Sequence, residues 1–492
     1  MHRLLVSAAH KSSGKTTVSV GLVAALAGQG TVVQPFKKGP DYIDPMWLAQ
    51  AAGRPCYNLD PTLMDDAALM RCVAAGVRGA ELVVVEGNKG LHDGLALDGS
   101  NSNAALAARL GLPVLLVIDA RGMTRGIAPL ILGFQAFDRR IRIGGVVLNR
   151  VGGARHEAKL RAVIAHYTDV PVLGAVAEDP RLAVLERHLG LMPCNELGDA
   201  AERVRSIGHI IGAQVDLAAV RALAASAGPL DLPAAAATAS ASASASTSTS
   251  TSTSTSTSTG SARARAGRVR IGIARDRAFG FYYPDDLEAL EAEGAQLVPI
   301  DTLHDSRLPP LDGLFVGGGF PEACLDELAA NAPLRVALCQ AVEAGLPTYA
   351  ECGGLMLMAR GIRWGDRHAP MVGAVPADAV MHPRPVGRGY VHLATTLHHP
   401  WAAPGVALRG HEFHHSALVD VGPEVAFAYR VTRGHGVDGV NDGVRVHNLL
   451  ASYAHLRTAA GGHWAPGFVA FVRAERRRRR VADHRTRLPQ RA

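Results

Sequence analysis

The chain has 492 residues, of which 48% are hydrophobic and 19% charged. This length and composition predict two or three domains with buried cores and exclude a wholly disordered chain. The formal net charge is +7, but residues 473–492 alone hold nine Arg against two acidic residues, so the rest is neutral. We interpret this segment as a solvated, disordered tail and expect no nucleic-acid partner.

The six cysteines form no C-x-x-C pair and no His/Cys cluster with zinc spacing. This usage is typical of a reduced protein. No apolar run approaches the roughly 18 to 20 residues that span a bilayer, and no apolar signal region opens the chain. We therefore expect a cytoplasmic protein without a membrane partner.

A phosphate-binding loop is predicted near the N-terminus, in the segment RLLVSAAHKSSGKTT of residues 3–17. An apolar run there leads through a small-residue turn into a helical pattern, although Ala9 replaces the usual first glycine. Backbone N–H groups would face nucleotide phosphates, Lys15 would reach the β and γ oxygens, and Thr16 would bind Mg²⁺. An ordinary helix start is the alternative. The residues assigned to ATP binding here are Ser13, Gly14, Lys15, Thr16 and Thr17.

A second polar loop follows the next short strand, with the sequence QPFKKGPDYIDP over residues 34–45. Two Lys and two Asp at the carboxyl edge of a strand would suit phosphate, Mg²⁺ and a carboxylate substrate. We expect Asp41 to hold Mg²⁺, and Lys37 and Lys38 to meet the substrate carboxylate or an acyl phosphate. An ordinary polar loop remains the alternative.

Further strands alternate with helices through the first 150 residues. The buried run 82–85 ends in Glu86, which becomes the second carboxylate expected on Mg²⁺. Strands are also predicted over 114–118 and 145–148, with a helix over 124–137 between them. This alternation predicts an α/β fold with a parallel sheet covered on both faces. Asn149 ends the last strand, where it would read the adenine edge or simply cap the strand.

An Ala/Ser and Ser/Thr repeat between Ala234 and Gly260 predicts a flexible tether and a domain boundary. The second domain again alternates strands and helices from Val269 onward. Its decisive segment is LPTYAECGGL, residues 346–355, in which Cys352 lies at a strand-to-helix turn before two glycines. This is typical of a nucleophile elbow, with Gly318, Gly319 and Gly353 as oxyanion donors.

A histidine base must come from elsewhere in the chain. We favour His455, at the end of the run from Leu449, over His447. The segment GHEFHHS, residues 410–416, is interpreted as too polar for a core strand. It would shape a substrate or interdomain surface, with metal binding as the weaker alternative.

Taken in order, SSGKTT, QPFKKGPDYIDP, GLPVLLVIDARGM, GGVVLNRVGGARHE, GGGFPE, AECGGLM, GHEFHHS and ASYAHL resemble the cobyrinic acid a,c-diamide synthase family over nearly the whole chain. The resemblance leaves out the linker and the tail, and it implies a dethiobiotin-synthetase-like P-loop domain joined to a class I glutamine amidotransferase domain. We place these domains over 1–233 and 267–472, with the Ala/Ser/Thr linker over 234–266 between them and the tail over 473–492. It implies ATP and Mg²⁺ as cofactors, glutamine as amido donor and a tetrapyrrole carboxylate as substrate.

Carried over residue by residue, the resemblance places Cys352 as glutaminase nucleophile and His455 as its base. Tyr42 and Ile43 fall where the family contacts substrate, and Asp44 and Asp93 fall on acidic positions of the synthetase site. The usual triad glutamate, two residues after the histidine, is Arg457 here. The family is known to lack that glutamate.

Some departures leave the ring substrate open. AHKSSGKTT and GPDYIDPMWL look like a branch that amidates sirohaem for dissimilatory sulfite reductase. We place cobyrinate or hydrogenobyrinate first, because amidating it is the main activity of the family that the chain resembles, and sirohaem second. A P-loop regulatory ATPase and a non-catalytic tetrapyrrole carrier are the rivals from other classes. A homodimer is compatible with all of these.

Overall fold

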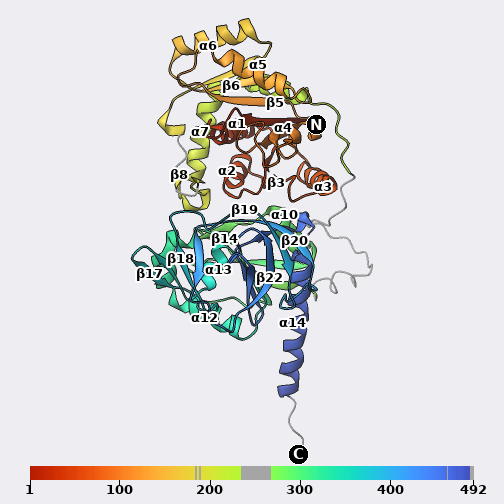
Figure 1. Ribbon diagram of the computed structural model, residues 1–492, viewed down its shortest axis with the longest axis vertical. Coiled ribbons are helices and arrows are strands. Elements are labelled where there is room, and N and C mark those ends of the chain that lie inside the picture. Colours follow the sequence, from red (N-terminus) through yellow and green to blue (C-terminus); the bar gives the residue numbers. More distant parts are fainter. Residues whose placement is uncertain (183–185, 188–189, 234–266, 462–463, 488–492) are drawn as a thin grey trace, which may run out of the picture. The chain divides into compact units, whose positions relative to one another are not determined.

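The computed structural model describes residues 1–182, 186–187, 190–233, 267–461 and 464–487. The chain divides into two compact units, within residues 1–235 and 236–492 (Figure 1). The expected linker over 234–266 lies outside the described residues. Among the described helices, none combines the length and apolar character needed to cross a bilayer.

The first unit is built on a seven-stranded parallel sheet with the order β3-β2-β4-β1-β5-β6-β7. Its central strand β1 lies between β4 and β5, so the carboxyl ends of β2, β4 and β1 are neighbours. The strands are β1 (His2–Ala8), β2 (Val33–Lys38), β3 (Tyr57–Leu59), β4 (Leu82–Glu86), β5 (Val114–Asp119), β6 (Ile143–Val151) and β7 (Val172–Ala177).

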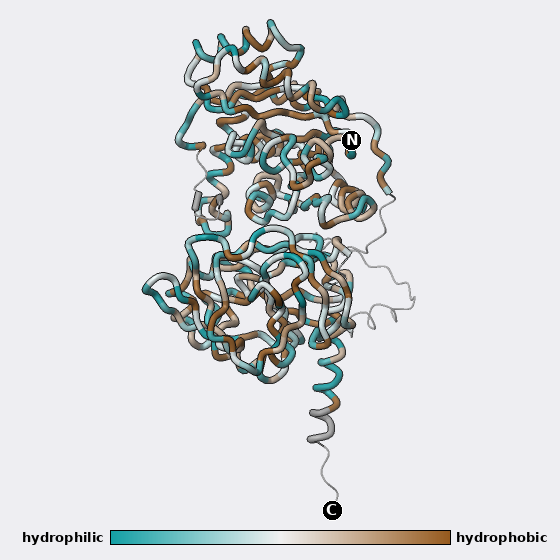
Figure 2. Tube along the Cα trace, viewed as in Figure 1, coloured by the Kyte–Doolittle hydropathy of each residue, from teal (hydrophilic) through white to brown (hydrophobic). Residues whose placement is uncertain are grey.

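Consecutive residues of these strands are buried on both faces of the sheet. Leu4, Leu5 and Val6 are all 0% exposed, although successive side chains point to opposite faces. Hydrophobic colouring accordingly follows much of this sheet in Figure 2. The covering helices are α1 (Lys15–Gly28), α2 (Ile43–Ala52), α3 (Asp66–Gly76), α4 (Asn103–Leu110), α5 (Ile127–Phe137), α6 (Ala154–Tyr167), α7 (Ala200–Gln214) and α8 (Leu217–Ala225). The expected parallel α/β sheet is confirmed.

The second unit contains a ten-stranded mixed sheet with the order β12-β10-β13-β15-β24-β23-β22-β19-β20-β25. The half from β12 to β24 is parallel and the other half antiparallel. The parallel strands are β10 (Val269–Ala274), β12 (Ala295–Ile300), β13 (Gly313–Val316), β15 (Thr348–Glu351) and β24 (Leu449–Ser452). The others are β19 (Gly387–Thr395), β20 (Ala407–His414), β22 (Ala426–Arg433), β23 (Asn441–Val446) and β25 (His455–Leu456).

Smaller elements complete this unit. A four-stranded sheet has the order β17-β16-β18-β21, and β11 pairs with β14. These strands are β11 (Phe279–Phe281), β14 (Gly318–Gly319), β16 (Gly361–Trp364), β17 (Arg367–Pro370), β18 (Asp378–Met381) and β21 (Ser416–Val419). The helices are α10 (Pro284–Ala292), α11 (Leu325–Ala330), α12 (Ala332–Glu343), α13 (Gly353–Met358) and α14 (Trp464–Arg487).

The prediction of a disordered tail from residue 473 is wrong for the described part of the chain. Helix α14 continues to Arg487, so the predicted domain end at residue 472 lies inside a helix. Trp464, Phe468 and Val472 are spaced four residues apart and are all buried, which anchors the helix on the unit. Beyond them, Arg476 Nη1 lies 3.2 Å from Asp312 Oδ2.

The segment GHEFHHS is likewise a strand, contrary to the expectation that it is too polar. Most of it forms the end of β20, in which His411, Glu412 and His414 are buried. The Glu412 carboxylate accepts hydrogen bonds from the backbone N–H groups of residues 435 and 436, at 2.7 and 2.8 Å. Burial of this acid is tolerated because its oxygens are hydrogen-bonded.

Candidate active site

The phosphate-binding loop lies between β1 and α1, where the sequence predicts it. Gly14 is the residue before α1 and has a φ of +81°, a left-handed conformation that favours glycine. A Cβ there would lie 2.1 Å from Asn149 Nδ2. Both the backbone and the neighbouring side chain therefore require glycine at this position.

Other residues assigned to ATP binding hold the loop itself. Asn149, at the end of β6, donates from Nδ2 to the Ser13 carbonyl over 2.9 Å. Ser13 Oγ donates to the His10 carbonyl over 2.8 Å. Thr17 Oγ1 lies 3.5 Å from the Leu182 carbonyl. Reading of adenine by Asn149 stays a prediction, and its visible contact fixes the loop.

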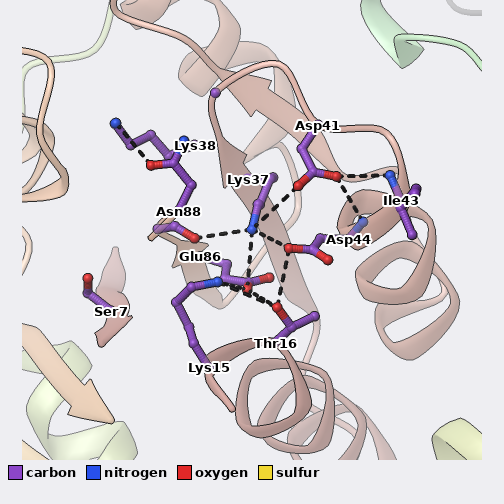
Figure 3. A network of polar contacts seen from close by, with 12 residues as sticks. Ser7, Lys15, Thr16, Lys37, Lys38, Asp41, Ile43, Asp44, Glu86 and Asn88 are labelled. Carbon is purple, nitrogen blue, oxygen red and sulfur yellow. Dashed lines mark hydrogen bonds and ion pairs between the residues drawn. The ribbon is translucent and has the colours of Figure 1, made fainter. Parts of the chain in front are cut away.

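A charged network joins α1, β2, α2 and β4 at the carboxyl edge of the sheet (Figure 3). Thr16 Oγ1 lies 2.8 Å from Glu86 Oε1 and 3.2 Å from Asp44 Oδ2. Lys15 forms an ion pair with Glu86. Lys37 forms ion pairs with Asp44 and, at 3.3 Å, with Glu86. Residues far apart in the sequence thus meet at this edge of the sheet.

Lys37 lies beneath the carboxylates and is only 1% exposed. Its Nζ also donates to the Gly87 carbonyl over 3.1 Å. Burial lowers the pKa of Lys37, but Asp44, Glu86 and Asp41 outweigh it and hold the pKa above its usual value. Lys37 is therefore a permanent cation that fixes the two nearest carboxylates, which is a different contact from the substrate contact predicted for it.

Asp41 lies at the edge of this charged network and not beside Thr16, where its predicted role as a Mg²⁺ ligand would place it. Its Oδ1 accepts hydrogen bonds from the backbone N–H groups of Ile43 and Asp44, at 2.9 and 3.1 Å, and so stabilises the start of α2. Its Oδ2 is 3.9 Å from Lys37 Nζ. Asp44, which we expect on the substrate, instead contacts Thr16 together with Glu86.

The remaining predicted residues of this site lie at its rim. Tyr42 precedes the first residue of α2, which is Ile43. Lys38 Nζ donates to Asn88 Oδ1 over 3.3 Å. Asp93 Oδ2 accepts the backbone N–H of Gly90 over 2.9 Å, which orders the loop after β4. Substrate contacts of these residues stay predictions.

In the second unit, Cys352 lies between β15 and α13 with φ +50° and ψ −101°. A non-glycine residue in this conformation is strained, as expected of a nucleophile elbow. Its Sγ is 4.0 Å from the Phe413 carbonyl oxygen. The neighbouring glycines permit close packing, because a Cβ at Gly353 would lie 2.7 Å from the Gly319 carbonyl oxygen.

His455 is brought to Cys352 by the pairing of β25 with β20. It is 3% exposed, and its interaction with Cys352 is one of the causes that raise the pKa of His455. A Cβ at Gly318 would lie 2.7 Å from the His455 ring, so Gly318 also borders the pair. His447, the rival base, has a φ of +49° in the turn between β23 and β24. The oxyanion roles of Gly318, Gly319 and Gly353 stay predictions.

One side chain of this site is not among the residues that the sequence predicts. Glu351, directly before the cysteine, lies 3.3 Å through Oε2 from His455 Nδ1. An acid that ends a buried run was the available signal, and the same signal identified Glu86. Arg457, at the usual triad position, instead pairs with Asp285 at 2.9 Å.

Comparisons with known proteins agree with this division into two sites. Residues 270–462 match the family described as "CobB/CobQ-like glutamine amidotransferase domain", and residues 2–184 match the "AAA domain". Among solved structures, "Structure of PurLQS from Thermotoga maritima" is 17% identical over 42% of this chain and 96% of that chain, with a TM-score of 0.33. That score is too low to carry an argument.

Relatives of similar length cover nearly the whole chain. The protein named "Cobyrinate a,c-diamide synthase" of Magnetococcus marinus is 43% identical over 96% of this chain and 97% of its own length. The protein of the same name in Methanosarcina acetivorans is 40% identical over 93% of each chain. That of Methanosarcina barkeri is 38% identical over 96% of each chain.

Proposed function

The chain belongs to the cobyrinate a,c-diamide synthase family, and from this premise we propose that it uses ATP and glutamine to amidate the a and c acetate carboxylates of cobyrinate or hydrogenobyrinate. The observation that carries the proposal is the presence in one chain of two different sites. One surrounds the phosphate-binding loop, and the other holds a buried Cys352 and His455 pair at a strained turn.

The second unit releases ammonia from glutamine. Cys352 Sγ attacks the carboxamide carbon, and the C–N bond breaks while His455 gives its proton to the departing ammonia. Water then adds to the thioester with His455 as base, the C–S bond breaks, and glutamate leaves. The backbone N–H groups beside Gly318, Gly319 and Gly353 are the proposed donors to the oxyanion.

The first unit activates the acid. A substrate carboxylate oxygen attacks the γ-phosphorus of ATP, the bond to the ADP oxygen breaks, and an acyl phosphate forms. Ammonia attacks its carbonyl carbon and phosphate leaves. For ATP to bind, Lys15 must exchange Glu86 for phosphate oxygens. Lys37 keeps Asp44 and Glu86 in place during that exchange, because it contacts both.

The residues present fit a Mg²⁺ ion. Glu86 is 0% exposed, and its Oε2 is a buried carboxylate oxygen with no hydrogen-bond partner among the residues that the structure describes, while its Oε1 contacts Thr16. One or two carboxylates with a hydroxyl and phosphate oxygens are a usual Mg²⁺ ligand set. We propose that Thr16, Asp44 and Glu86 hold the ion, in place of the predicted set with Asp41. When bound, Mg²⁺ would neutralise charge on the transferring phosphoryl group.

The rival functions use only part of this machinery. A regulatory ATPase would leave the Cys352 and His455 pair without a role, and a tetrapyrrole carrier would use neither site. Sirohaem remains the second proposed ring substrate, because the AHKSSGKTT and GPDYIDPMWL segments resemble the branch that amidates it. It is distinguished from cobyrinate only by assay.

The decisive experiment incubates the full chain with ATP, Mg²⁺, glutamine and either cobyrinate, hydrogenobyrinate or sirohaem, with mass spectrometry of the ring. We expect conversion of two carboxylates to amides on cobyrinate or hydrogenobyrinate, with ADP and glutamate formed in step. Amidation of sirohaem alone would reassign the substrate. Glutamine hydrolysis without amidation of any ring would overturn the synthetase assignment.

A further inference from the structure

A buried carboxylate touches the proposed glutaminase base from the residue next to the nucleophile. Glu351 is the last residue of β15 and is 3% exposed. Its Oε2 lies 3.3 Å from His455 Nδ1. Because β15 pairs in parallel with β24, the strand that carries the nucleophile runs beside the strand that leads to the histidine. Sheet pairing thus brings the two side chains together.

We propose that Glu351 is the positioning residue of the glutaminase site, which orients His455 in the role that the third member of a triad has elsewhere. The inference rests on the proposed function, because it takes Cys352 as nucleophile and His455 as base. It assigns the third role to the residue directly before the nucleophile, not to one that follows the histidine.

The usual third position is held by a cation that points elsewhere. Arg457 is 1% exposed and forms hydrogen bonds through Nε and Nη2 to Asp285 Oδ2, at 3.0 and 2.9 Å. Its guanidinium also lies 4.8 Å from the centre of the Tyr283 ring. Arg457 therefore stabilises the neighbouring α10 region and offers His455 no acceptor.

The two carboxylate oxygens of Glu351 contact different groups. Tyr349 donates its hydroxyl to Oε1 over 2.6 Å, and the Leu456 backbone N–H donates to the same oxygen over 3.1 Å. Oε2 is left to face His455. A carboxylate held in this way is preorganised, so little rearrangement is needed when the imidazole takes up a proton.

The contact determines which ring nitrogen carries a proton. When Nδ1–H donates to Glu351, Nε2 is the nitrogen available to Cys352. The carboxylate also stabilises the imidazolium that forms when the thiol loses its proton. Burial lowers the pKa of His455, but the hydrogen bonds to Cys352 and Glu351 outweigh it and raise the pKa to about 10.

Apart from the Cys352 sulfur, no titratable neighbour in the described part of the site other than Glu351 supplies a negative charge to this ring. His411 of β20 stacks on His455 with ring centres 4.9 Å apart at 16°. Burial, with the nearby charges of His455 and Arg457, lowers the pKa of His411 well below its usual value, so it is neutral. Tyr283 lies beyond it, with its hydroxyl 3.4 Å from His411 Nδ1. Glu351 is thus the carboxylate that faces the base.

The test is Glu351→Gln, which keeps the side-chain size and removes the charge. We expect glutaminase kcat to fall on the order of 10²-fold, by analogy with loss of a triad carboxylate. We expect KM for glutamine to change by less than about threefold, because Glu351 contacts the base and not the substrate. Ammonium-dependent amidation should continue at the wild-type rate.

Alkylation of Cys352 by iodoacetamide, followed by mass spectrometry of its peptide, separates positioning from a structural role. The thiolate is the reactive species, and the imidazolium stabilises it. In Glu351→Gln, alkylation should fall about tenfold or more near pH 6 and approach wild type near pH 9 to 10, where an ordinary thiol also ionises. A decrease of equal size at every pH would show a structural role only and would overturn the inference.

Two controls accompany this variant. Asp378→Asn removes another buried carboxylate of the same unit, which pairs with Arg363, and should leave glutaminase kcat unchanged. Cys352→Ala tests the proposed function itself. If Cys352→Ala retains glutaminase, the proposed function fails. If it is inactive while Glu351→Gln has wild-type kcat, only the inference fails.

A second variant tests the inference if Glu351→Gln does not fold. Tyr349→Phe removes one donor to Glu351 Oε1 and leaves the carboxylate in place. We expect a smaller decrease in kcat, several-fold, with a correspondingly smaller loss of alkylation near pH 6, in a variant whose circular dichroism matches wild type. A wild-type alkylation profile in this folded variant, with Glu351→Gln unfolded, would overturn the inference.

Discussion

The two proposed sites stabilise their buried charged groups in different ways. In the first unit, two lysines and two carboxylates meet within one network at the edge of a parallel sheet. In the second, the Glu351 carboxylate contacts the His455 imidazole, which also interacts with the Cys352 thiol, so the group contains a single carboxylate. A site for a ligand with many charges must itself contain charged groups, and these are stable in the absence of the ligand only when they form ion pairs with one another. Chemistry at one neutral carboxamide needs only a fixed proton path.

The largest expected effect separates the two sites completely. Cys352→Ala should abolish glutamine-dependent amidation, because no thiolate remains to attack the carboxamide. Amidation with high ammonium should persist, since the synthetase site receives ammonia from solution. Product formation with each nitrogen donor is the measurement, and Cys339→Ala is the matched control. Loss of both activities in a folded Cys352→Ala protein would contradict the division of labour.

Removal of the central cation should damage the first site most. Lys37→Met leaves the two carboxylates of Asp44 and Glu86 near each other without their buried lysine. Loss of one partner of a buried ion pair costs about 3–5 kcal/mol of the free energy of unfolding. We expect a lower Tm and no ATP-dependent amidation, with basal glutamine hydrolysis retained.

Lys38→Met is the comparison for that variant, because the neighbouring lysine donates to the uncharged side chain of Asn88, at Oδ1. It should cost only about 1 kcal/mol. Tm measured by differential scanning calorimetry, with the two activities assayed separately, checks both. Equal Tm values for the two variants would show that Lys37 does not hold the carboxylates.

A carboxylate exchange tests the revised metal assignment. Asp44→Asn should lower kcat of ATP-dependent amidation by about 10²-fold, as for loss of a preorganised electrostatic group. Asp41→Asn should have a weaker effect, because its Oδ1 accepts backbone N–H groups of α2. Both should keep basal glutaminase. The reverse order of kcat values would restore Asp41 as the metal ligand.

Local patterns predicted the first site better than the second. Gly14, Lys15 and Thr16 follow one another at the end of a strand, and Glu86 ends a buried run, so parallel pairing alone brings them together. The contact of Glu351 with His455 joins residues 104 positions apart. It depends on the pairing of β15 with β24 and of β20 with β25, and no local sequence pattern specifies that pairing.

Polar residues misled the sequence analysis wherever their partners were distant. The polar residues of GHEFHHS predict that it is not a core strand. The strand forms because backbone N–H groups of residues 435 and 436, distant in sequence, donate hydrogen bonds to the Glu412 carboxylate. The tail was judged disordered from its arginines, although Trp464 and Phe468, a few residues earlier, anchor the helix that continues through it. Burial of these groups depends on tertiary contacts that composition does not record.

The smallest expected effect concerns the phosphate-binding loop, the part of either site that depends most on local sequence. Gly14→Ala introduces a Cβ that would lie 2.1 Å from Asn149 Nδ2, at a φ of +81°. The loop must shift, and its N–H groups with it, so we expect KM for ATP to rise about tenfold with glutaminase unchanged. Gly28→Ala, at the far end of the same helix, has open space around the new Cβ. It should leave KM for ATP at the wild-type value. Steady-state kinetics on ATP for both variants decide the matter, and equal KM values would show that the loop tolerates displacement and that its local geometry is not what binds the nucleotide.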